Sequence, residues 1–137
     1  MALVGGGGAG NVAGSNPSGT GTSLNYIGNH AYAYSGAITT TTASSAATTY
    51  LDFTTGNEYV VGTFHWLEAY TGNADRHIDI LINGESVMAG TADDSANQLY
   101  AQPIKILLPS YSKVTVKYGI SGQTIPVTWV MVGRIYA

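Results

Sequence analysis

The sequence predicts an all-β protein, an antiparallel β-sandwich that forms a jelly roll of about eight strands. Three observations indicate this class. From about residue 24 onward, segments rich in Tyr, Thr, Val and Ile alternate apolar and polar residues with the period of two that strands have. Turn residues separate these segments at regular intervals. No long apolar stripe with the period of a helix competes with them.

The 137 residues fit one domain of ordinary size, which is preceded by an arm. Residues 1–27 are expected to be an extended, Gly-rich N-terminal arm, and residues 28–137 are expected to form the sandwich. Strands are expected at 30–39, 47–54, 58–70, 76–82, 85–89, 103–108, 112–120 and 125–136.

Two of these segments show the alternation most clearly. In 112–120, one face carries Val114, Val116, Tyr118 and Ile120, and the other carries polar residues, so one face is expected in the core and one in water. Residues 76–82 alternate in the same way. Asn-Gly at 83–84 follows them and favours a two-residue turn with positive φ, which predicts a hairpin into 85–89.

The segments 58–70 and 125–136 are apolar on both faces, unlike a half-buried surface strand. Their second apolar face must be covered, either by another part of the chain or by another subunit. Two such strands in a small domain favour a homo-oligomer. The candidate interface residues are Tyr59, Val61, Leu67, Val130 and Val132.

The arm contains mostly Gly, Ser, Thr and Asn, with too little apolar surface to fold alone. Fixing its backbone would cost about 1 to 2 kcal/mol per residue, and Gly is the residue that loses most freedom. We therefore expect the arm to lie against another chain as an extended strand or strap. The residues expected to make these contacts are Met1, Leu3, Val4, Val12, Leu24, Tyr26 and Ile27.

Composition and charge exclude several classes of function. The formal net charge is −3 and only 9% of residues are charged, so no nucleic-acid-binding surface is expected. The absence of Cys excludes disulfides, thiolate zinc sites and Cys nucleophiles. No charged residue precedes Asp52, yet no run of about 18 apolar residues occurs, so no membrane-spanning segment is expected, and no export signal is visible.

The polar residues form no recognisable catalytic, cofactor or metal motif. Asp75, His77 and Asp79 share one strand face, but a metal site would need further ligands, such as Glu68 from a neighbouring strand. Residues 91–97 resemble an acidic calcium-binding loop without the spacing of an EF-hand. No GxSxG elbow, phosphate-binding loop or distinctive carboxylate pair is present. We expect no enzyme activity and no cofactor.

The ten tyrosines and two tryptophans leave a second possibility open. Aromatic rings can stack on the apolar faces of sugars, which would make the protein a lectin-like module. The alternative is that tyrosines such as Tyr32, Tyr34, Tyr50, Tyr59 and Tyr118 follow strand alternation and fill cores or subunit interfaces.

Five segments resemble small jelly-roll head-decoration proteins, also called cement proteins, of tailed bacteriophages. They are GNHAYAYSG (28–36), LDFTTGN (51–57), ING (82–84), ILLP (106–109) and GRIY (133–136). The resemblance implies a non-enzymatic virion protein, commonly trimeric, that sits on the outer capsid surface and bridges subunits of the major capsid protein. The Gly-rich arm departs from this pattern.

The expected function is therefore capsid decoration by a homotrimer, with the arm as a strap and with no nucleic-acid or membrane partner. The alternative is a receptor-binding or carbohydrate-binding β-sandwich module of a phage fibre or spike.

Overall fold

The computed structural model describes residues 24–68, 74–92 and 103–136, and the regular structure in these ranges consists of strands. The strands are β1 (Asn25–Ile27), β2 (His30–Thr39), β3 (Thr48–Thr54), β4 (Tyr59–Glu68), β5 (Arg76–Ile82), β6 (Glu85–Ala92), β7 (Ile104–Leu108), β8 (Lys113–Ile120) and β9 (Pro126–Tyr136).

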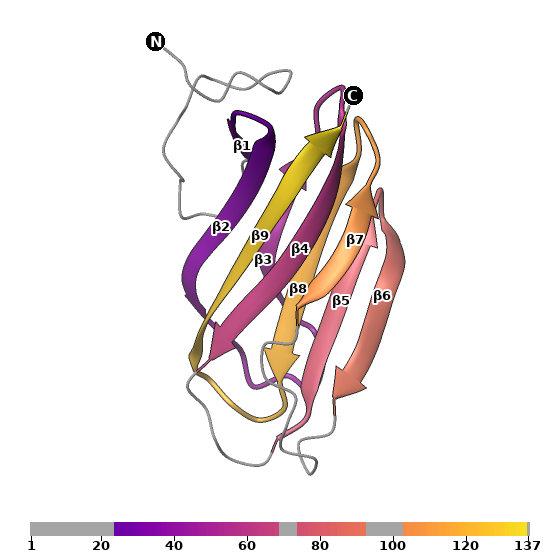
Figure 1. The fold of residues 1–137 in the computed structure, drawn as a ribbon. Helices are drawn as coiled ribbons and strands as arrows, with labels where there is room; N and C mark the ends of the chain where they lie inside the picture. The colour runs from indigo at the N-terminus through magenta and orange to yellow at the C-terminus, as the bar shows by residue number, and fades with distance from the viewer. Residues whose placement is uncertain (1–23, 69–73, 93–102, 137) are drawn as a thin grey trace.

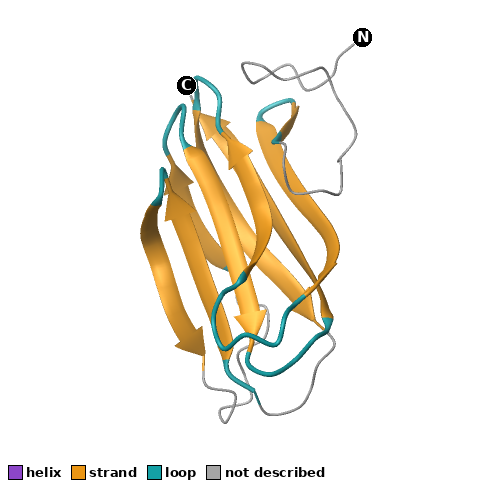
Figure 2. Cartoon of the chain, turned by 180° about the vertical axis from the view of Figure 1, so that it is seen from behind, coloured by secondary structure: helices purple, strands orange, loops and turns teal. Residues whose placement is uncertain are grey.

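The strands form two antiparallel sheets, one of five strands in the order β1-β2-β9-β4-β7 and one of four in the order β3-β8-β5-β6. Figure 1 shows the sheets as two layers whose strands run along the long axis of the molecule. Seen from behind in Figure 2, the described loops lie at the two ends of the layers. The predicted all-β antiparallel sandwich is confirmed.

From β2 to β9, every connection passes from one sheet to the other except the β5-β6 hairpin. With β1 set aside, each sheet has the strand order that a jelly roll of eight strands would have. Strand order does not give the hand in which the connections wrap, so the jelly roll stays a prediction.

The individual strand predictions agree closely with the structure. The bounds of β2 and β5 are those predicted, and the described ends of the other predicted strands differ by at most three residues. The predicted hairpin is confirmed, because Asn83 (φ 53°) and Gly84 (φ 85°) form the turn between β5 and β6. The short β1 is not predicted, since three residues carry too little periodic pattern.

The core lies between the inner faces of the two sheets. Val114, Val116, Tyr118 and Ile120 are fully buried there, as the alternation in 112–120 predicts. Tyr118 also belongs to an aromatic cluster with Trp66 and Trp129. The centroid of its ring lies 5.8 Å from that of Trp66 and 5.7 Å from that of Trp129.

A β-bulge in β2 adjusts which side chains face inward. The register with β9 shifts between Tyr34 and Ala37, with Gly36 at a φ of 70°. The Ser35 hydroxyl accepts a hydrogen bond from the backbone N–H of Trp129 at 2.9 Å, which anchors the bulge to the middle of β9. The extra residue leaves Tyr34 and Ala37 on the outer face of the sheet, opposite Val130 and Thr128.

The structure corrects the predicted boundary between the arm and the sandwich. Residues 25–27 belong to the five-stranded sheet, because β1 pairs with β2. Tyr26 is buried in the core, and its hydroxyl accepts a hydrogen bond from the backbone N–H of Gly56 at 3.1 Å. It is therefore unavailable for the partner contact that the sequence suggested. Leu24 packs against the same core, whereas Ile27 is exposed.

The close contact between β8 and the segment that precedes β3 allows a test of this packing. A Cβ atom at Gly119 would lie 2.0 Å from the carbonyl oxygen of Ser45, so the backbone would have to move. We expect Gly119→Ala to lower the free energy of unfolding by about 3 kcal/mol, measured by urea denaturation. In Gly90→Ala the new methyl group would meet open space, so this control should change stability by less than about 1 kcal/mol.

Candidate functional site

The outer face of the five-stranded sheet is the candidate functional surface, which we call the sheet face. In the described part of the chain, ten large hydrophobic side chains are exposed, and the strand registers place seven of them on this face. These seven are Ile27, Tyr34, Tyr59, Leu67, Leu107, Val132 and Tyr136.

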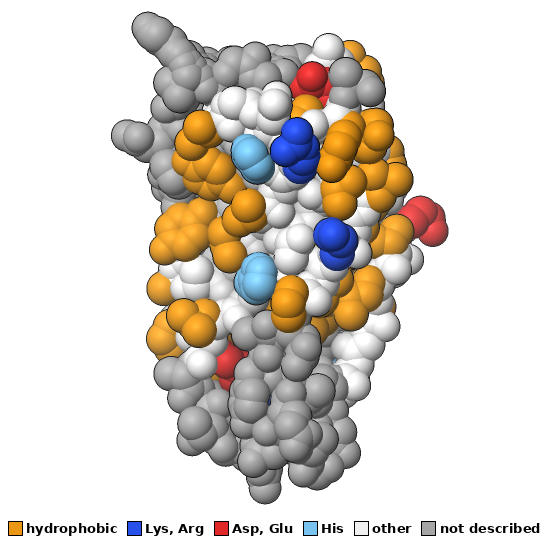
Figure 3. Space-filling view, viewed as in Figure 1, with side chains coloured by type: hydrophobic (Ala, Val, Ile, Leu, Met, Phe, Trp, Pro, Cys, Tyr) orange, Lys and Arg blue, Asp and Glu red, His pale blue; other side chains and the backbone are white. Residues whose placement is uncertain are grey.

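Exposed apolar side chains lie on three neighbouring strands of the sheet face. Leu67 on β4 is 72% exposed, Leu107 on β7 is 56% exposed and Val132 on β9 is 50% exposed. The rings of Tyr59 and Tyr136 stack with their centroids 5.4 Å apart. Figure 3 shows patches of apolar side chains towards both sides of this view, with Lys, Arg, His and other polar side chains between them.

A shallow hollow of about 350 Å³ lies on the sheet face. It is lined by Tyr34, His65, Trp66, Leu67, Thr128 and Val130. The hollow could receive one or two protruding apolar side chains, because its volume lies near the lower end of the range of ordinary ligand sites.

The charge of the sheet face has one sign. Its strands place Arg134 and Lys105 on the outer side, and none of its described residues is an outward-facing carboxylate. The guanidinium of Arg134 lies 5.8 Å from the centroid of the Tyr136 ring. The outer face of the other sheet differs, since Lys113 and Asp52 form an ion pair there at 3.5 Å. The strands of the sheet face therefore combine apolar side chains with two basic ones.

The five interface residues expected from the sequence all lie on the sheet face. Tyr59, Leu67 and Val132 are exposed, and Val61 and Val130 are partly buried between their neighbours. Whether they contact another subunit stays a prediction. Of the residues expected in the arm contact, Met1, Leu3, Val4 and Val12 lie outside the described residues, whereas Ile27 lies on the sheet face opposite His30.

Sequence reasoning missed three members of the sheet face. Tyr34 was weighed as a general core or interface residue, and only the bulge fixes its outward direction. Leu107 lies in a short, nearly continuous apolar strand whose faces cannot be separated from sequence alone. Tyr136 is directly opposite Tyr59. The alternation along β9 that places Val130 and Val132 on the outer face also places Tyr136 there, so this signal was present in the sequence.

The polar stripe considered as a metal site has other partners. The two ring nitrogens of His77 lie 3.0 Å from the hydroxyl of Thr91 and 2.7 Å from that of Ser121. The Asp79 carboxylate accepts a hydrogen bond from Ser86. Among the residues that the structure describes, no three His, Asp or Glu side chains form a group that could hold a metal ion. The acidic segment that begins at Asp93 lies outside them.

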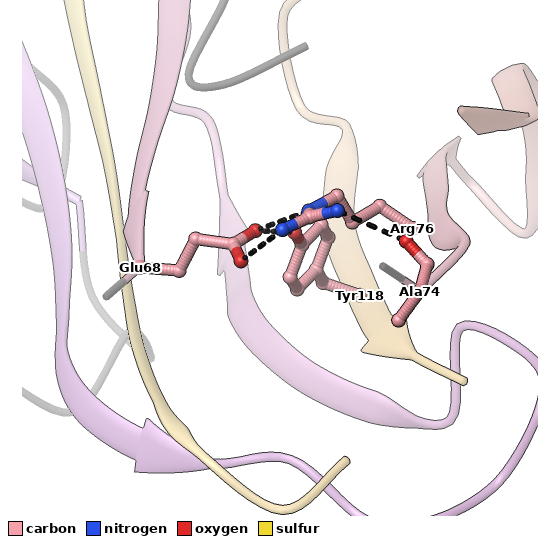
Figure 4. A network of polar contacts seen from close by, with 4 residues as sticks. All are labelled: Glu68, Ala74, Arg76 and Tyr118. Carbon is pink, nitrogen blue, oxygen red and sulfur yellow. Dashed lines mark hydrogen bonds and ion pairs between the residues drawn. The ribbon is translucent and has the colours of Figure 1, made fainter. Parts of the chain in front are cut away.

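A buried polar network links the two sheets at one end of the sandwich, as Figure 4 shows. The Arg76 guanidinium donates two hydrogen bonds of 3.0 Å to the Glu68 carboxylate and one of 2.9 Å to the Ala74 carbonyl. The Tyr118 hydroxyl donates a further hydrogen bond to Glu68. The ion pair is almost fully buried, and because its geometry is bidentate and its strands come from both sheets, we assign it a structural role.

Comparisons with known protein families and with curated proteins find no match. In the described ranges, no helix is long and apolar enough to span a membrane.

Removing the charge of Glu68 should be costly, because Arg76 would be left buried without its counter-ion. We expect Glu68→Gln to lower the free energy of unfolding by about 3 to 5 kcal/mol in urea denaturation. The matched control is Asp52→Asn, which removes a carboxylate from a solvent-exposed pair and should cost less than about 1 kcal/mol. Equal losses for the two variants would contradict the structural role.

Three buried tyrosines predict a loss of stability in alkali. Burial raises the pKa of Tyr118, and the hydrogen bond to Glu68 and its charge raise it further. Burial is also the main cause that raises the pKa of Tyr50 and Tyr26. The unfolded chain ionises its tyrosines near the ordinary value of 10.0, whereas the folded chain keeps these three neutral at higher pH. Stability is therefore fully present below pH 10 and falls as the pH rises above it.

The slope should approach about 1.4 kcal/mol per pH unit for each tyrosine that stays neutral in the folded chain. Urea denaturation between pH 9 and pH 11.5 measures it, and Tyr118→Phe should make the slope shallower by up to this amount. An unchanged slope in Tyr118→Phe would show that Tyr118 does not contribute.

Proposed function

We propose that this protein is a non-enzymatic structural protein that assembles through its sheet face. The observation that carries the proposal is the exposure of seven large hydrophobic side chains on one side of one sheet. Exposed apolar side chains that gather on one face of a protein are typical of protein interfaces. Aromatic residues and Arg, which interfaces favour, are both present, with Tyr34, Tyr59, Tyr136 and Arg134 on the face.

The charge of the sheet face favours a particular kind of contact. A face-to-face contact around a two-fold axis near Lys105 and Arg134 would bring these basic side chains of the two copies together. A heterologous contact, in which the sheet face meets a different surface, avoids this repulsion. Heterologous contacts close into rings such as trimers, and they also suit docking on another protein.

Within this proposal, the specific role is decoration of the head of a tailed bacteriophage. The protein would form a homotrimer on the outer capsid surface and bridge subunits of the major capsid protein. The sequence resemblance supports this role, and so does the combination of a sandwich with an apolar docking face. An interface of ordinary size buries about 1,600 Å², and many such contacts on one particle would resist the internal pressure of packaged DNA. No cofactor is required for this mechanical role.

Assembly through the sheet face is tested by placing charged side chains on it and measuring the oligomeric state. We expect the full-length protein to be a trimer in light scattering, and Leu67→Lys combined with Val132→Lys to raise the dissociation constant at least about ten-fold. The matched control places the same two lysines on the outer face of the other sheet, as Thr49→Lys with Thr54→Lys, and should leave assembly unchanged. Circular dichroism checks that both variants fold.

A wild-type chain that stays monomeric at high concentration would overturn self-assembly through the sheet face. Capsid decoration has a separate test, since the protein should bind expanded heads of the virus that encodes it and the lysine variant should bind more weakly. Failure of the wild-type protein to bind such heads would overturn decoration and leave self-assembly standing.

Carbohydrate binding is the second candidate function. The stacked and exposed pair Tyr59 and Tyr136, with Arg134 beside it, is the observation that favours a sugar platform. A glycan array separates the two functions. Binding of a defined glycan that is lost in Tyr59→Ala and Tyr136→Ala would favour recognition over assembly.

A further inference from the structure

The two sheets have four edge strands among the described residues, and β6 is the least protected of them. The edge strand β1 has three residues, and β7 has five with Lys105 among them. The edge strand β3 carries a register shift and Asp52. In contrast, β6 has eight residues, and no charged residue follows Glu85 within it. Short strands, charges and bulges are the usual protection of sheet edges, and residues 86–92 have only a register shift near their start.

The inner side of β6 is also open. Met88 and Gly90 point toward the space between the sheets, because they pair with the inward-facing Ile80 and Ile78. Met88 is nevertheless 37% exposed, and a Cβ atom at Gly90 would meet open space. A small apolar pocket of about 150 Å³ lies here, lined by Ile78, Met88, Gly90 and Thr91. A strand added beside β6 could place one apolar side chain in this pocket.

We propose that β6 is an acceptor edge, and that residues 2–4 of a neighbouring copy add to it as a further strand. These residues are Ala2, Leu3 and Val4, the most continuous apolar segment before residue 24. Backbone hydrogen bonds to β6 would hold the segment, and Leu3 or its neighbours would supply the side chain for the pocket. This would satisfy the expectation that the arm binds another chain, and it names the surface that receives it.

Charge distinguishes this occupant from a second β6. Glu85 begins β6, and Asp93 and Asp94 follow it directly in the sequence. Antiparallel pairing of two β6 strands would bring the acidic ends of the two copies together, which like charges oppose. The arm has no charged side chain, since the first in the sequence is Asp52. An uncharged apolar segment therefore suits this edge better than a second copy of the edge itself.

Chain length permits donation to a neighbouring copy. Figure 1 shows β1 and β6 at opposite sides of the sandwich, so Leu24, where the described residues begin next to β1, lies on the side away from β6. Between Val4 and Leu24 lie 23 − 4 = 19 residues, which span up to about 60 Å when extended. A five-stranded sheet is only about 20 Å wide, so the segment can reach a neighbour. A neighbouring copy whose β6 lies within this distance could receive the segment.

The test uses the absence of Cys from the chain, which allows single-cysteine variants of the full-length protein. Ala2→Cys, Leu3→Cys and Val4→Cys are each mixed with Met88→Cys or with Ala89→Cys, and disulfide-linked dimers are counted after mild oxidation. Tyr111→Cys, on the exposed turn between β7 and β8, replaces the β6 variants as the control. Disulfides form only between Cβ atoms about 3.5 to 4.5 Å apart, so the yield reports side-chain direction.

We expect the yield to alternate along the arm and the alternation to reverse between Met88→Cys and Ala89→Cys, because these two residues lie on opposite faces of β6. The favoured pairs should give at least about five times the yield of the Tyr111→Cys control. Equal yields at all three arm positions, or yields no higher than the control, would overturn the proposal. Predominant disulfides between two Met88→Cys chains would also overturn it, because they would indicate pairing of two β6 strands.

The inference rests on the proposed function only in requiring that copies of the chain meet. The same mixtures made with the Leu67→Lys and Val132→Lys variant separate the two proposals. Suppose that the lysine variant assembles as well as the wild-type protein and that its disulfide yield still alternates along the arm. The sheet-face proposal then fails and the acceptor edge stands. If the wild-type protein assembles through the sheet face but the yield does not alternate, only the acceptor edge fails.

Discussion

The central strand β9 pairs along its length with β2 on one side and with β4 on the other. This pairing fixes whether each of its side chains points into the core or to the outer face of the sheet. A central strand of this kind can neither rotate nor slip by one residue without moving its whole inner set into water. Trp129 and Met131 face inward and are fully buried, so Val130 and Val132 must face outward. The apolar sheet face is therefore a direct result of the same pairing that closes the core.

The buried network at one end of the sandwich supports this arrangement. Glu68 ends β4 in the five-stranded sheet, while Arg76 and Tyr118 belong to strands of the other sheet. Their contacts join the two layers at the point where Leu67, the preceding residue of β4, projects outward. The hydrogen bonds of the Glu68 carboxylate anchor the backbone directly beside the exposed Leu67 side chain. Rigid presentation of apolar side chains reduces the entropy lost when a partner binds.

Much of the fold could be predicted because strand alternation is a local signal. Residues 112–120 and the Asn-Gly turn at 83–84 carry their structure in adjacent residues, so their strands and their hairpin were predicted correctly. The same alternation placed Val130 and Val132 on the outer side of their strand.

What could not be predicted depends on distant partners. Tyr26 is held by the backbone of Gly56, and Arg76 by Glu68, contacts that no sequence spacing displays. The outward direction of Tyr34 depends on a bulge that is anchored by Trp129. Sequence pattern therefore gave the strands, while the boundary of the arm and the full extent of the sheet face required the tertiary pairing.

The bulge at Ser35 and Gly36 also limits how this chain could change over time. One additional residue in β2 keeps its two halves in phase, so both present their apolar side chains correctly to the core. Deletion of one residue there would move the inward-facing side chains of one half of β2 to the outer face of the sheet. Substitutions on the outer side of β2 are tolerated far more easily than any change in its length. Natural variants of this chain should therefore differ in the side chains of β2 and keep the same number of residues in it.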